Sequence, residues 1–567
     1  MNKKIIGRAV RILITVIAIF LVFWFTLPPI NLRSSDFYNF AVVSLIIIYV
    51  LNFLSLGGVT EAVREGGDGV SAEKLKNTLK SMKKSTKAFL IPVVLIIALS
   101  FVATFIGSPF FFSSVYKDLI VKEDGDFAED IVELSMSQIP VVDKDTASRL
   151  GLRKLGEMSD LVSQFEIRED YTQINYRGRP YRVTSLNYGD FFKWMGNTSN
   201  GIPAYITVDM TTQETELIRL EEGIRYSPGE YLMRNINRYL RFKYPTKIFE
   251  SVSFEIDEEG TPYWIAPTVT FRIALWSGRD IDGAVLVNAI TGEHVFYGID
   301  EIPSWVDQIY TSSLVVEQLN YNGKYQSGFL NSIFGQKGVL QPTQGYNYIA
   351  INDDVYLYTG MTSVAGDQSN VGFVMVNLRT KETKFYTVPG AEEYSAMSSA
   401  EGQVQHLGYN STFPILLNVA DRPTYFMSLK DGAGLVKMYA FVDVDRYQVV
   451  GTGTTVDEAR SNYITKLSAE SDVVIPDDSD SVKTETVSGT VADIRQVVLG
   501  GETYYYFSLT DGDGIYSASL RVDPRLAFLS AGEEIKITFD PSAAPYDVSE
   551  IAFAVYPVED IPSDETN

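Results

Sequence analysis

The chain has 567 residues, a formal net charge of −23 and no cysteine. Its length predicts several domains rather than one, and the lack of cysteine excludes disulfides, thiol nucleophiles and cysteine-ligated metals. The charge is uneven, because residues 1–112 carry 12 basic and 5 acidic side chains whereas the remainder has a net charge of −30. Such an acidic remainder argues against nucleic acid and against an anionic membrane surface as its partners.

Three apolar stretches near the start of the chain predict transmembrane helices, over residues 12–28, 40–56 and 88–112. Each approaches or exceeds the roughly 20 residues that a helix needs to cross a bilayer. The second is the shortest, and a re-entrant segment is the alternative there. A signal peptide is the alternative for the first, but no small-residue cleavage site follows it. We therefore expect a membrane anchor over residues 1–112.

Basic residues predict the orientation of this anchor. The first loop, residues 31–39, contains only Arg33, whereas the second, residues 57–87, contains seven Lys and Arg. By the positive-inside rule the N-terminus and second loop are cytoplasmic, and the chain from about residue 113 is extracytoplasmic. Residues 72–84 predict a basic amphipathic helix on the inner leaflet, or else a solvated loop that only sets topology. A large extracytoplasmic region without disulfides suits a Gram-positive envelope.

The rest of the chain is organised around the pattern Val-[Asp/Asn]-x-x-Thr-x-Glu. It begins at Val208, Val287 and Val376, and a degenerate copy begins at Val442, with spacings of 79, 89 and 66 residues. Recurrence at such intervals indicates a repeated supersecondary unit. Each copy lies between two apolar, strand-like runs, and its middle residues form turns, so it predicts the tip of a β-hairpin. The glutamates at its end are candidate acid catalysts, but their recurrence at equivalent hairpin positions favours a structural role: Glu214, Glu293 and Glu382.

Each hairpin is preceded by another strand pair and by a helical stretch, so the repeating unit is a helix followed by an antiparallel meander. The predicted helices span residues 146–161, 228–244, 303–319 and 392–406, and a last one spans 456–467. The fold class is α+β. The predicted boundaries are a stalk at 113–142, units at 143–225, 226–300, 301–390 and 391–467, an acidic linker at 468–484, a small β-barrel at 485–557 and a tail at 558–567.

The second unit, over residues 257–293, resembles the PepSY domain, with its Asp-x-x-Gly-Thr-Pro-Tyr-Trp turn and its Val-Asn-x-x-Thr-Gly-Glu hairpin. PepSY-like units are usually non-catalytic and extracytoplasmic, and the resemblance implies protease regulation or binding of wall-associated partners. Residues 143–147, 172–176 and 328–331 also resemble membrane-anchored proteins of Gram-positive bacteria that have no assigned activity. Neither resemblance supplies catalytic residues.

Short alternating strands over residues 485–557 resemble an OB-fold. OB-folds bind nucleic acids, sugars or proteins, and the acidic charge disfavours nucleic acid here, so a structural barrel is the simpler interpretation. The run from Asp511 to Gly514 looks like the start of a calcium loop, but the twelfth position of such a loop would be Val522 instead of glutamate. We expect a turn there.

No catalytic or metal-binding motif is evident. The two histidines, His294 and His406, have no partner at a metal-ligand or catalytic spacing, so no catalytic residue, cofactor or metal is predicted. Two aromatic stretches are candidate partner surfaces, with repeat-to-repeat contacts as the alternative. Their residues are Tyr188, Phe191, Phe192 and Trp194, and Tyr321, Tyr325 and Phe329.

The sequence therefore predicts a non-catalytic, membrane-anchored extracytoplasmic scaffold or binding protein of the bacterial cell envelope. Its expected partners are the membrane and either another envelope protein or a cell-wall polymer, and its oligomeric state is not defined. Two alternatives stay open. One is an accessory subunit of a membrane complex, in which the helices dock to a partner. The other is an envelope hydrolase or protease whose site has no recognisable motif.

Overall fold

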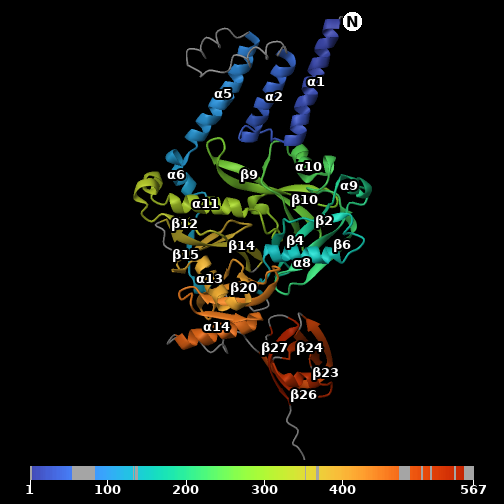
Figure 1. Cartoon of the computed structure of the whole chain (residues 1–567), viewed down its shortest axis with the longest axis vertical. Coiled ribbons are helices and arrows are strands. Elements are labelled where there is room, and N and C mark those ends of the chain that lie inside the picture. Colours follow the sequence, from blue (N-terminus) through green and yellow to red (C-terminus); the bar gives the residue numbers. More distant parts are fainter. Residues whose placement is uncertain are drawn as a thin grey trace, which may run out of the picture. The chain divides into compact units, whose positions relative to one another are not determined.

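A computed structural model defines the fold as mixed α+β, as predicted (Figure 1). The described residues are 3–53, 84–131, 133, 138–351, 353–364, 369–470, 485–499, 502–510, 512, 514–520, 522–539, 541 and 544–553. The chain forms two compact units, a larger body over Met1–Lys466 and a smaller one over Leu467–Asn567.

The larger body begins with three apolar helices, α1 (Lys3–Thr26), α2 (Ser35–Phe53) and α5 (Lys84–Ile106). Two contain a stretch long and apolar enough to cross a membrane, Ala9–Thr26 and Phe89–Ile106, whereas the apolar part of α2, Ser35–Leu51, is shorter. Two helices rather than the predicted three therefore meet the length criterion among the described residues. The predicted amphipathic helix at 72–84 lies outside those residues except for Lys84.

The third apolar stretch ends earlier than predicted. Helix α5 stops at Ile106, and a new helix, α6 (Pro109–Lys117), begins with proline in its first turn after Ser108. Proline is well tolerated there because the first turn has no intrahelical partner for its missing N–H. Phe110 and Phe111 therefore belong to a separate helix beside the body.

Four antiparallel sheets with the same topology follow. In each, two short strands both pair with a long third strand, which pairs with a fourth, which pairs with a fifth. The units are β2 (Phe165–Ile167), β3 (Thr172–Tyr176), β4 (Arg179–Tyr188), β5 (Ile202–Asp209) and β6 (Thr215–Ile224); β7 (Ile248–Phe249), β8 (Ser253–Ile256), β9 (Pro262–Ile273), β10 (Ser277–Asn288) and β11 (His294–Gly298); β12 (Leu340–Pro342), β13 (Asn347–Ile351), β14 (Asp354–Ser363), β15 (Ser369–Asn377) and β16 (Thr383–Tyr386); and β18 (Asn410–Ser411), β19 (Ile415–Val419), β20 (Arg422–Lys430), β21 (Val436–Asp443) and β22 (Val450–Gly453).

The repeated pattern forms hairpin tips of one geometry. In the first, Asp209 Oδ1 accepts hydrogen bonds from the N–H groups of Thr211 and Thr212, and Thr212 Oγ1 accepts from Glu214 N–H. The second and third tips repeat these bonds around Asn288 and Asn377. The residue before the glutamate has positive φ in all three: Gln213 (64°), Gly292 (78°) and Lys381 (66°).

A second regularity extends to the fourth unit. In each unit, the residue two positions after the valine of the pattern accepts a hydrogen bond at its backbone carbonyl. The donor is a backbone N–H in the segment that leads into the helix of the same unit. The donors are Val141, Tyr226, Tyr310 and Ala391, and the acceptors are Met210, Ala289, Leu378 and Val444. The fourth hairpin thus keeps the connection although its sequence lacks the Thr and Glu. This shared bond closes each helix-plus-meander unit on itself.

Replacing Gly292 with alanine is expected to destabilise the second unit by about 2–4 kcal/mol, because a left-handed backbone disfavours a side chain and the new Cβ would collide with the Tyr226 ring. The matched change Gln213→Ala keeps a Cβ at a position with the same φ and removes only a bond to Tyr439 (3.2 Å), so about 1 kcal/mol is expected. Urea unfolding of the detergent-solubilised chain measures both. Equal effects would contradict the role assigned to Gly292.

The helices that precede the sheets are α8 (Lys144–Gly156), α10 (Ile236–Lys243), α11 (Ser312–Lys324) and α13 (Glu393–Gln403), and α14 (Val456–Glu470) follows the last sheet. The helix predicted over 228–244 is wrong in its first half. Leu232 has φ of 53°, residues Leu232–Arg234 form a 3-10 turn, and Asn235 rather than Ser227 caps α10. The helix predicted over 303–319 begins later, because Thr311 caps it.

The segment predicted to be a stalk is part of the body. Strand β1 (Glu123–Gly125) adds in parallel to β16 of the third sheet, and Lys384 forms an ion pair of 3.1 Å with Asp130. Further along, the Ile131 carbonyl accepts a hydrogen bond from Asn418 in the fourth unit. This segment therefore ties the third and fourth units together, which its mixed, acidic sequence did not reveal.

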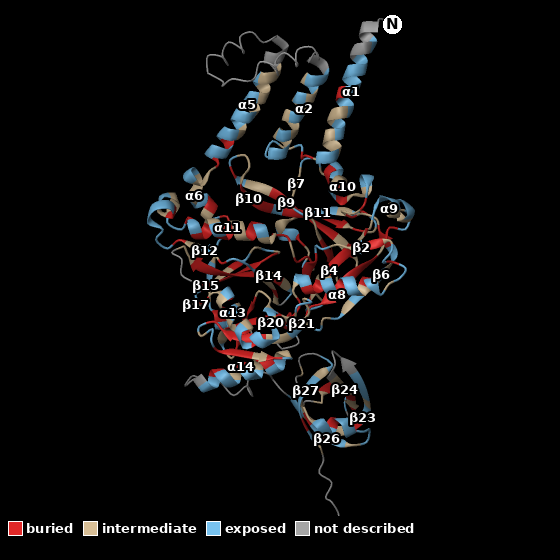
Figure 2. Cartoon of the chain, in the orientation of Figure 1, coloured by how far each residue is buried: buried red, intermediate tan, exposed pale blue. Residues whose placement is uncertain are grey.

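One continuous core joins the second and third units. Leu314, Val315 and Leu319 of α11 are fully buried between the sheet of β9 and β10 and the sheet of β14 and β15. Figure 2 shows these strands largely buried, while α1 and α5 are mostly exposed and α2 is exposed or intermediate. The units thus form one packed body instead of separate beads.

The smaller unit is a closed five-stranded barrel in the order β23-β24-β25-β27-β26. Strands β25 and β27 are parallel and the other neighbours are antiparallel. Its core contains Phe507, Ala518 and Ile537. This arrangement fits an OB-like fold. The strands are β23 (Glu485–Leu499), β24 (Glu502–Leu509), β25 (Ile515–Ser519), β26 (Glu534–Phe539) and β27 (Tyr546–Phe553).

Candidate functional site

The most unusual polar cluster of the body lies where three units meet. Both carboxylate oxygens of Glu255 on β8 accept backbone hydrogen bonds, from Asp307 (2.9 Å) and Gln308 (3.2 Å), in the segment that leads into α11. Asp307 in turn accepts from the N–H of Asn175 on β3 at 2.7 Å, and Gln308 donates to the carbonyl of Gln173 at 2.9 Å. We name these five residues the central joint.

The two acids of the central joint are shifted toward their neutral forms. Glu255 and Asp307 are 0% and 1% exposed. Burial raises the pKa of Glu255 to about 7. Burial and the neighbouring Glu255 charge raise the pKa of Asp307 well above its usual value. Paired carboxyls with raised pKa can serve as catalytic acids, but these two have no exposed surface that a substrate could reach, so they act on the packing of the units.

A buried ion pair connects the second and third units. Lys381, at the tip of the third hairpin, donates to Asp280 on β10 at 2.6 Å and to the carbonyl of Leu119 at 2.9 Å. Arg272 also bonds Asp280, at 3.0 Å. Asp280 is 5% exposed. Lys381 is the positive-φ residue of its hairpin tip, and its side chain contacts another unit. Gln213, the equivalent residue of the first tip, also contacts another unit, because it bonds Tyr439 of the fourth unit.

Another buried acid joins the last two units. Glu393, at the start of α13, accepts hydrogen bonds from the N–H of Gly360 (2.9 Å), from Thr343 (3.1 Å) and from Asn370 (3.3 Å) in the third sheet. Asn370 also donates to Tyr425 on β20. Burial raises the pKa of Glu393. The side chain is fully buried, so it too holds units together.

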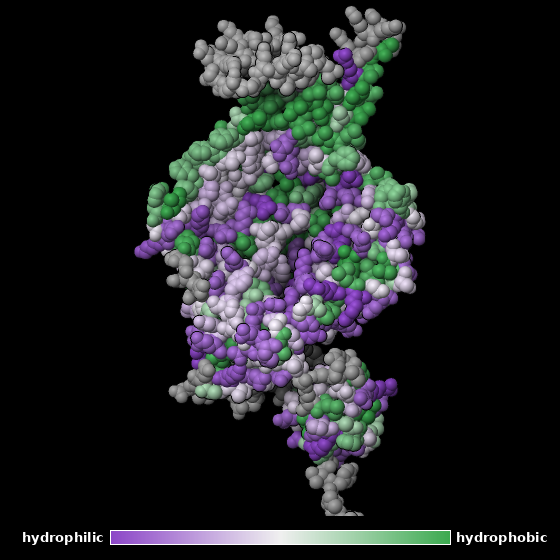
Figure 3. All heavy atoms as spheres, viewed as in Figure 1, coloured by the Kyte–Doolittle hydropathy of each residue, from purple (hydrophilic) through white to green (hydrophobic). Residues whose placement is uncertain are grey.

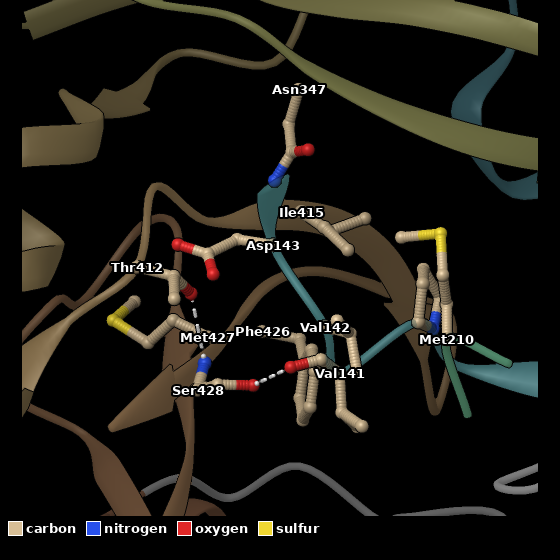
Figure 4. A pocket seen from close by; sticks show the side chains of 11 residues that line it. Val141, Val142, Asp143, Met210, Asn347, Thr412, Ile415, Phe426, Met427 and Ser428 are labelled. Atoms are coloured by element: carbon tan, nitrogen blue, oxygen red, sulfur yellow. Dashed lines mark hydrogen bonds between the residues drawn. The ribbon is translucent and has the colours of Figure 1, made fainter. Parts of the chain in front are cut away.

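A small hollow lies between the first, third and fourth units (Figure 4). Ser428 donates to the carbonyl of Val141, and the apolar residues Met210, Ile415 and Phe426 also line the hollow. Its volume of about 20 Å³ suffices for a single water molecule. It is therefore a packing gap.

An open recess lies along α13. Its lining consists of hydroxyl side chains and one carboxylate, and Tyr394 and Tyr447 are 46% and 40% exposed. Its volume of about 410 Å³ is within the range of small-ligand sites. Exposed tyrosines beside serines favour contact with a polar partner more than chemistry, because no base is paired with a nucleophile here. The lining residues are Glu392, Tyr394, Ser395, Ser398, Ser399 and Tyr447.

The first predicted aromatic surface is partly buried. Tyr188 is 7% exposed, which corrects the expectation that it faces outward, and it donates to Glu230 at 2.8 Å. Trp194 donates to the other Glu230 oxygen at 2.7 Å. Phe191 and Phe192 are exposed, at 45% and 75%. They lie on α9 (Phe191–Asn197), a helix that the sequence analysis missed although Asp190 provides its cap.

The second predicted aromatic surface is also divided. Tyr325 is 5% exposed, a second correction, and packs with Tyr116 and Tyr321. Phe329 is half-buried, and its ring lies 5.3 Å from that of Phe110 on α6. The tyrosines thus support α6, whereas the apolar residues that follow Phe329 are exposed, namely Leu330, Ile333 and Phe334.

The remaining candidates are structural. Tyr244 and His294 Nδ1 share a hydrogen bond of 2.9 Å, and burial together with the Lys243 charge lowers the pKa of His294. His406 lies in a 3-10 turn, Gln405–Leu407. The glutamates of the hairpin tips are exposed and contribute their backbone to the tips. No group of three or more metal-ligating side chains occurs within the described part of the chain.

No family model and no curated protein matches the chain. The resemblance of the second unit to PepSY domains therefore stays a prediction. Sequence reasoning missed Glu230, Glu255, Asp307 and Lys381. A signal existed for Asp307, which interrupts the apolar run from Trp305 to Tyr310, but Glu255 alternates with apolar residues as an exposed strand residue would.

Proposed function

We propose that the chain is a non-catalytic, membrane-anchored extracytoplasmic scaffold or binding protein of the cell envelope. The observation that carries this proposal is the use of the buried polar side chains. Glu255, Asp307, Asp280 and Glu393 each connect two or more units, and none is more than 5% exposed. Polar groups used in this way stiffen the body, and the four acids themselves are out of reach of a substrate.

The membrane topology of the proposal has three crossings. Helix α2 has 19 residues, which at 1.5 Å per residue is about 28 Å and close to the thickness of the hydrocarbon core. Figure 1 shows α1, α2 and α5 side by side, and both the last residue of α2, Phe53, and the first residue of α5, Lys84, lie at the ends of these helices away from the sheets. Seven basic residues lie between positions 57 and 87, and the positive-inside rule places them in the cytoplasm.

The proposed units are PepSY-like, and the smaller unit is OB-like. A helix followed by an antiparallel sheet, four times over, is compatible with that family hypothesis for the units. For a binding role, the exposed recess along α13 offers tyrosine and serine side chains to an envelope protein or a wall polymer.

An accessory-subunit role is the second candidate. Only 6% of the Ala9–Thr26 stretch and 11% of the Phe89–Ile106 stretch are buried. The exposed surface of these helices can therefore contact the helices of a partner as well as lipid. Replacing residues 1–112 with an unrelated membrane anchor separates the two roles. Loss of the partner after this exchange favours the accessory subunit, and retention favours the scaffold.

The test of the proposal is crosslinking in intact cells, with a photoreactive residue at Tyr447 in the recess and an affinity tag after Asn567. A matched control carries the photoreactive residue at Leu152 on α8, which is 58% exposed. We expect one envelope protein or a wall polymer to be captured from Tyr447 and not from Leu152. Equal capture from both sites, together with peptidase or glycan-hydrolase activity of the purified chain, would reject the proposal.

A further inference from the structure

Aromatic residues mark the level at which the apolar helices meet the sheets. The indole of Trp276, in the turn between β9 and β10, donates to Thr104 on α5 at 3.2 Å and lies 5.4 Å from the ring of Tyr38 on α2. At the end of α1, the guanidinium of Arg238 lies 4.3 Å from the ring of Trp24. Trp and Tyr concentrate at the boundary between bilayer and water. These residues therefore indicate where a bilayer surface would lie.

A first group of exposed apolar side chains adjoins this level beside α1. Arg238, which stacks on Trp24, also donates to the carbonyl of Leu232 at 2.7 Å. Leu232 is 62% exposed, and Tyr231 beside it contacts the rings of Phe191 and Trp194. The exposed apolar members of this group, with their exposed fractions, are Phe191 (45%), Phe192 (75%), Met195 (55%), Leu232 (62%) and Met233 (44%).

A second group adjoins the same level beside α5. Helix α6 begins three residues after α5 ends, and Phe110 contacts the ring of Phe329 at 5.3 Å. The turn that follows Phe329 is held by hydrogen bonds from Ser332 to the Phe329 carbonyl and from Asn331 to the Lys337 carbonyl. Its exposed apolar residues point away from the core. The members of this group are Phe110 (57%), Phe111 (51%), Leu330 (64%), Ile333 (49%) and Phe334 (81%).

The two groups flank the base of the helices. Figure 1 places α6 and α9 on opposite sides of that base, and Figure 3 shows hydrophobic surface on both sides, next to the hydrophobic surface of the helices. Contiguous exposed apolar surface of this kind marks an interaction site. The first group is linked to Trp24 at the end of α1 through Arg238, and Phe111 of the second contacts Phe105 at the end of α5. The bilayer surface is therefore the neighbour that both groups can meet at once.

The local charge suits a lipid headgroup layer. Residues 231–247 contain five Lys and Arg and no Asp or Glu, and residues 328–337 contain one Lys and no acid. This contrasts with the net charge of −30 over the chain beyond residue 112. Long basic side chains beside buried aromatics can reach lipid phosphates while their stems stay in the apolar layer. The net negative charge of the chain beyond residue 112 therefore does not apply to these two segments.

We propose that these two groups, together named the lipid-facing rim, insert into the headgroup boundary of the leaflet next to the body and fix its sheets at a defined tilt to the membrane. This inference rests on the proposed membrane anchor. Glu230 and the Tyr321–Tyr325 pair hold the rim in place from below, through Trp194 and Phe329 respectively. A flexible tether would leave the body free to rotate, whereas the rim makes anchor and body one rigid unit on the membrane.

The absence of native cysteine permits a direct test with single labels on the full chain. Phe192→Cys and Phe334→Cys report on the two groups, Phe101→Cys in α5 is the membrane control, and Leu407→Cys in the fourth unit is the aqueous control. Leu407 and Phe101 are 43% and 75% exposed. Each variant carries an environment-sensitive fluorophore in nanodiscs with anionic lipid, and quenching by brominated lipid and by aqueous iodide is measured.

Lipid quenching at the two rim positions is expected to exceed that at Leu407 by roughly tenfold, because an inserted side chain contacts the quencher directly. Strong lipid quenching at Phe101 with none at the rim would overturn the inference while keeping the anchor. Rim labels shielded from both quenchers would also overturn it, because protein and not lipid would then cover the rim. No lipid quenching at any of the positions would reject the membrane anchor itself. Thermal unfolding of each labelled chain confirms that the substitution is tolerated.

Discussion

Replacing Asp280 with alanine is expected to destabilise the larger body by about 3–5 kcal/mol, because removal of one partner leaves the other charge buried and unpaired. Among the described residues, the Lys381 ammonium would retain the Leu119 carbonyl at 2.9 Å and the face of the Tyr310 ring at 5.1 Å as its partners. Its side chain is 16% exposed, too little for water to replace the carboxylate. Urea unfolding and hydrogen exchange across β10 and β15 measure the loss.

Two controls separate the buried charge from the mere loss of a contact. Adding Lys381→Met to Asp280→Ala is expected to recover part of the stability, because the double variant no longer buries an unpaired ammonium. The exposed pair of Asp160 and Arg219 provides the second control, and Asp160→Ala is expected to leave the unfolding curve unchanged. If the double variant is no more stable than Asp280→Ala alone, the ion pair does not hold the second and third units together.

The hairpin tips could be predicted from sequence because their bonds are local. Asp209, Asn288 and Asn377 accept from N–H groups two and three residues onward, so the residues that decide the turn lie within it. The same locality explains why the barrel and the repeated helix-plus-meander order could be inferred. The helix boundaries near Leu232 could not, because the bond from Arg238 to the Leu232 carbonyl and the contacts of Tyr231 with α9 are tertiary interactions and not matters of local propensity.

The joints between units could not be predicted because their partners are far apart in sequence. Lys381 and Asp280 are 101 residues apart, and Gln213 and Tyr439 are 226 apart. Lys381 and Gln213 occupy a variable position of the pattern, and they share a positive φ but no residue type that would mark them in the sequence. Glu255 alternates with apolar neighbours as an exposed residue would, and only the approach of β3 and the Asp307 segment buries it. The burial of the aromatic stretches likewise depends on distant partners, on Glu230 for the first stretch and on α6 for the second.

The central joint is expected to make stability depend on pH. Glu255 has a pKa of about 7 in the folded chain and 4.5 when unperturbed. A group whose pKa is higher in the folded than in the unfolded chain stabilises the folded state fully at pH values below the unfolded-state pKa. This stabilisation is lost as the pH rises through the folded-state pKa. Stability should therefore fall between about pH 4.5 and 7.5, by on the order of 3 kcal/mol from this group. Denaturant midpoints across this range, with hydrogen exchange of β3 and β8 as the local readout, measure the fall.

Two amide substitutions at the central joint are expected to have opposite effects. Asp307→Asn keeps an acceptor for the Asn175 N–H and places its NH₂ where Oδ1 has no hydrogen-bond partner among the described residues. It should remove the part of the pH dependence that comes from Asp307, leave the part from Glu255, and keep stability at pH 7.5. Glu255→Gln must turn its NH₂ toward the N–H of Asp307 or Gln308, which costs about 1–3 kcal/mol. If both variants keep the full pH dependence of the parent chain, these acids do not couple protons to the junction of the three units.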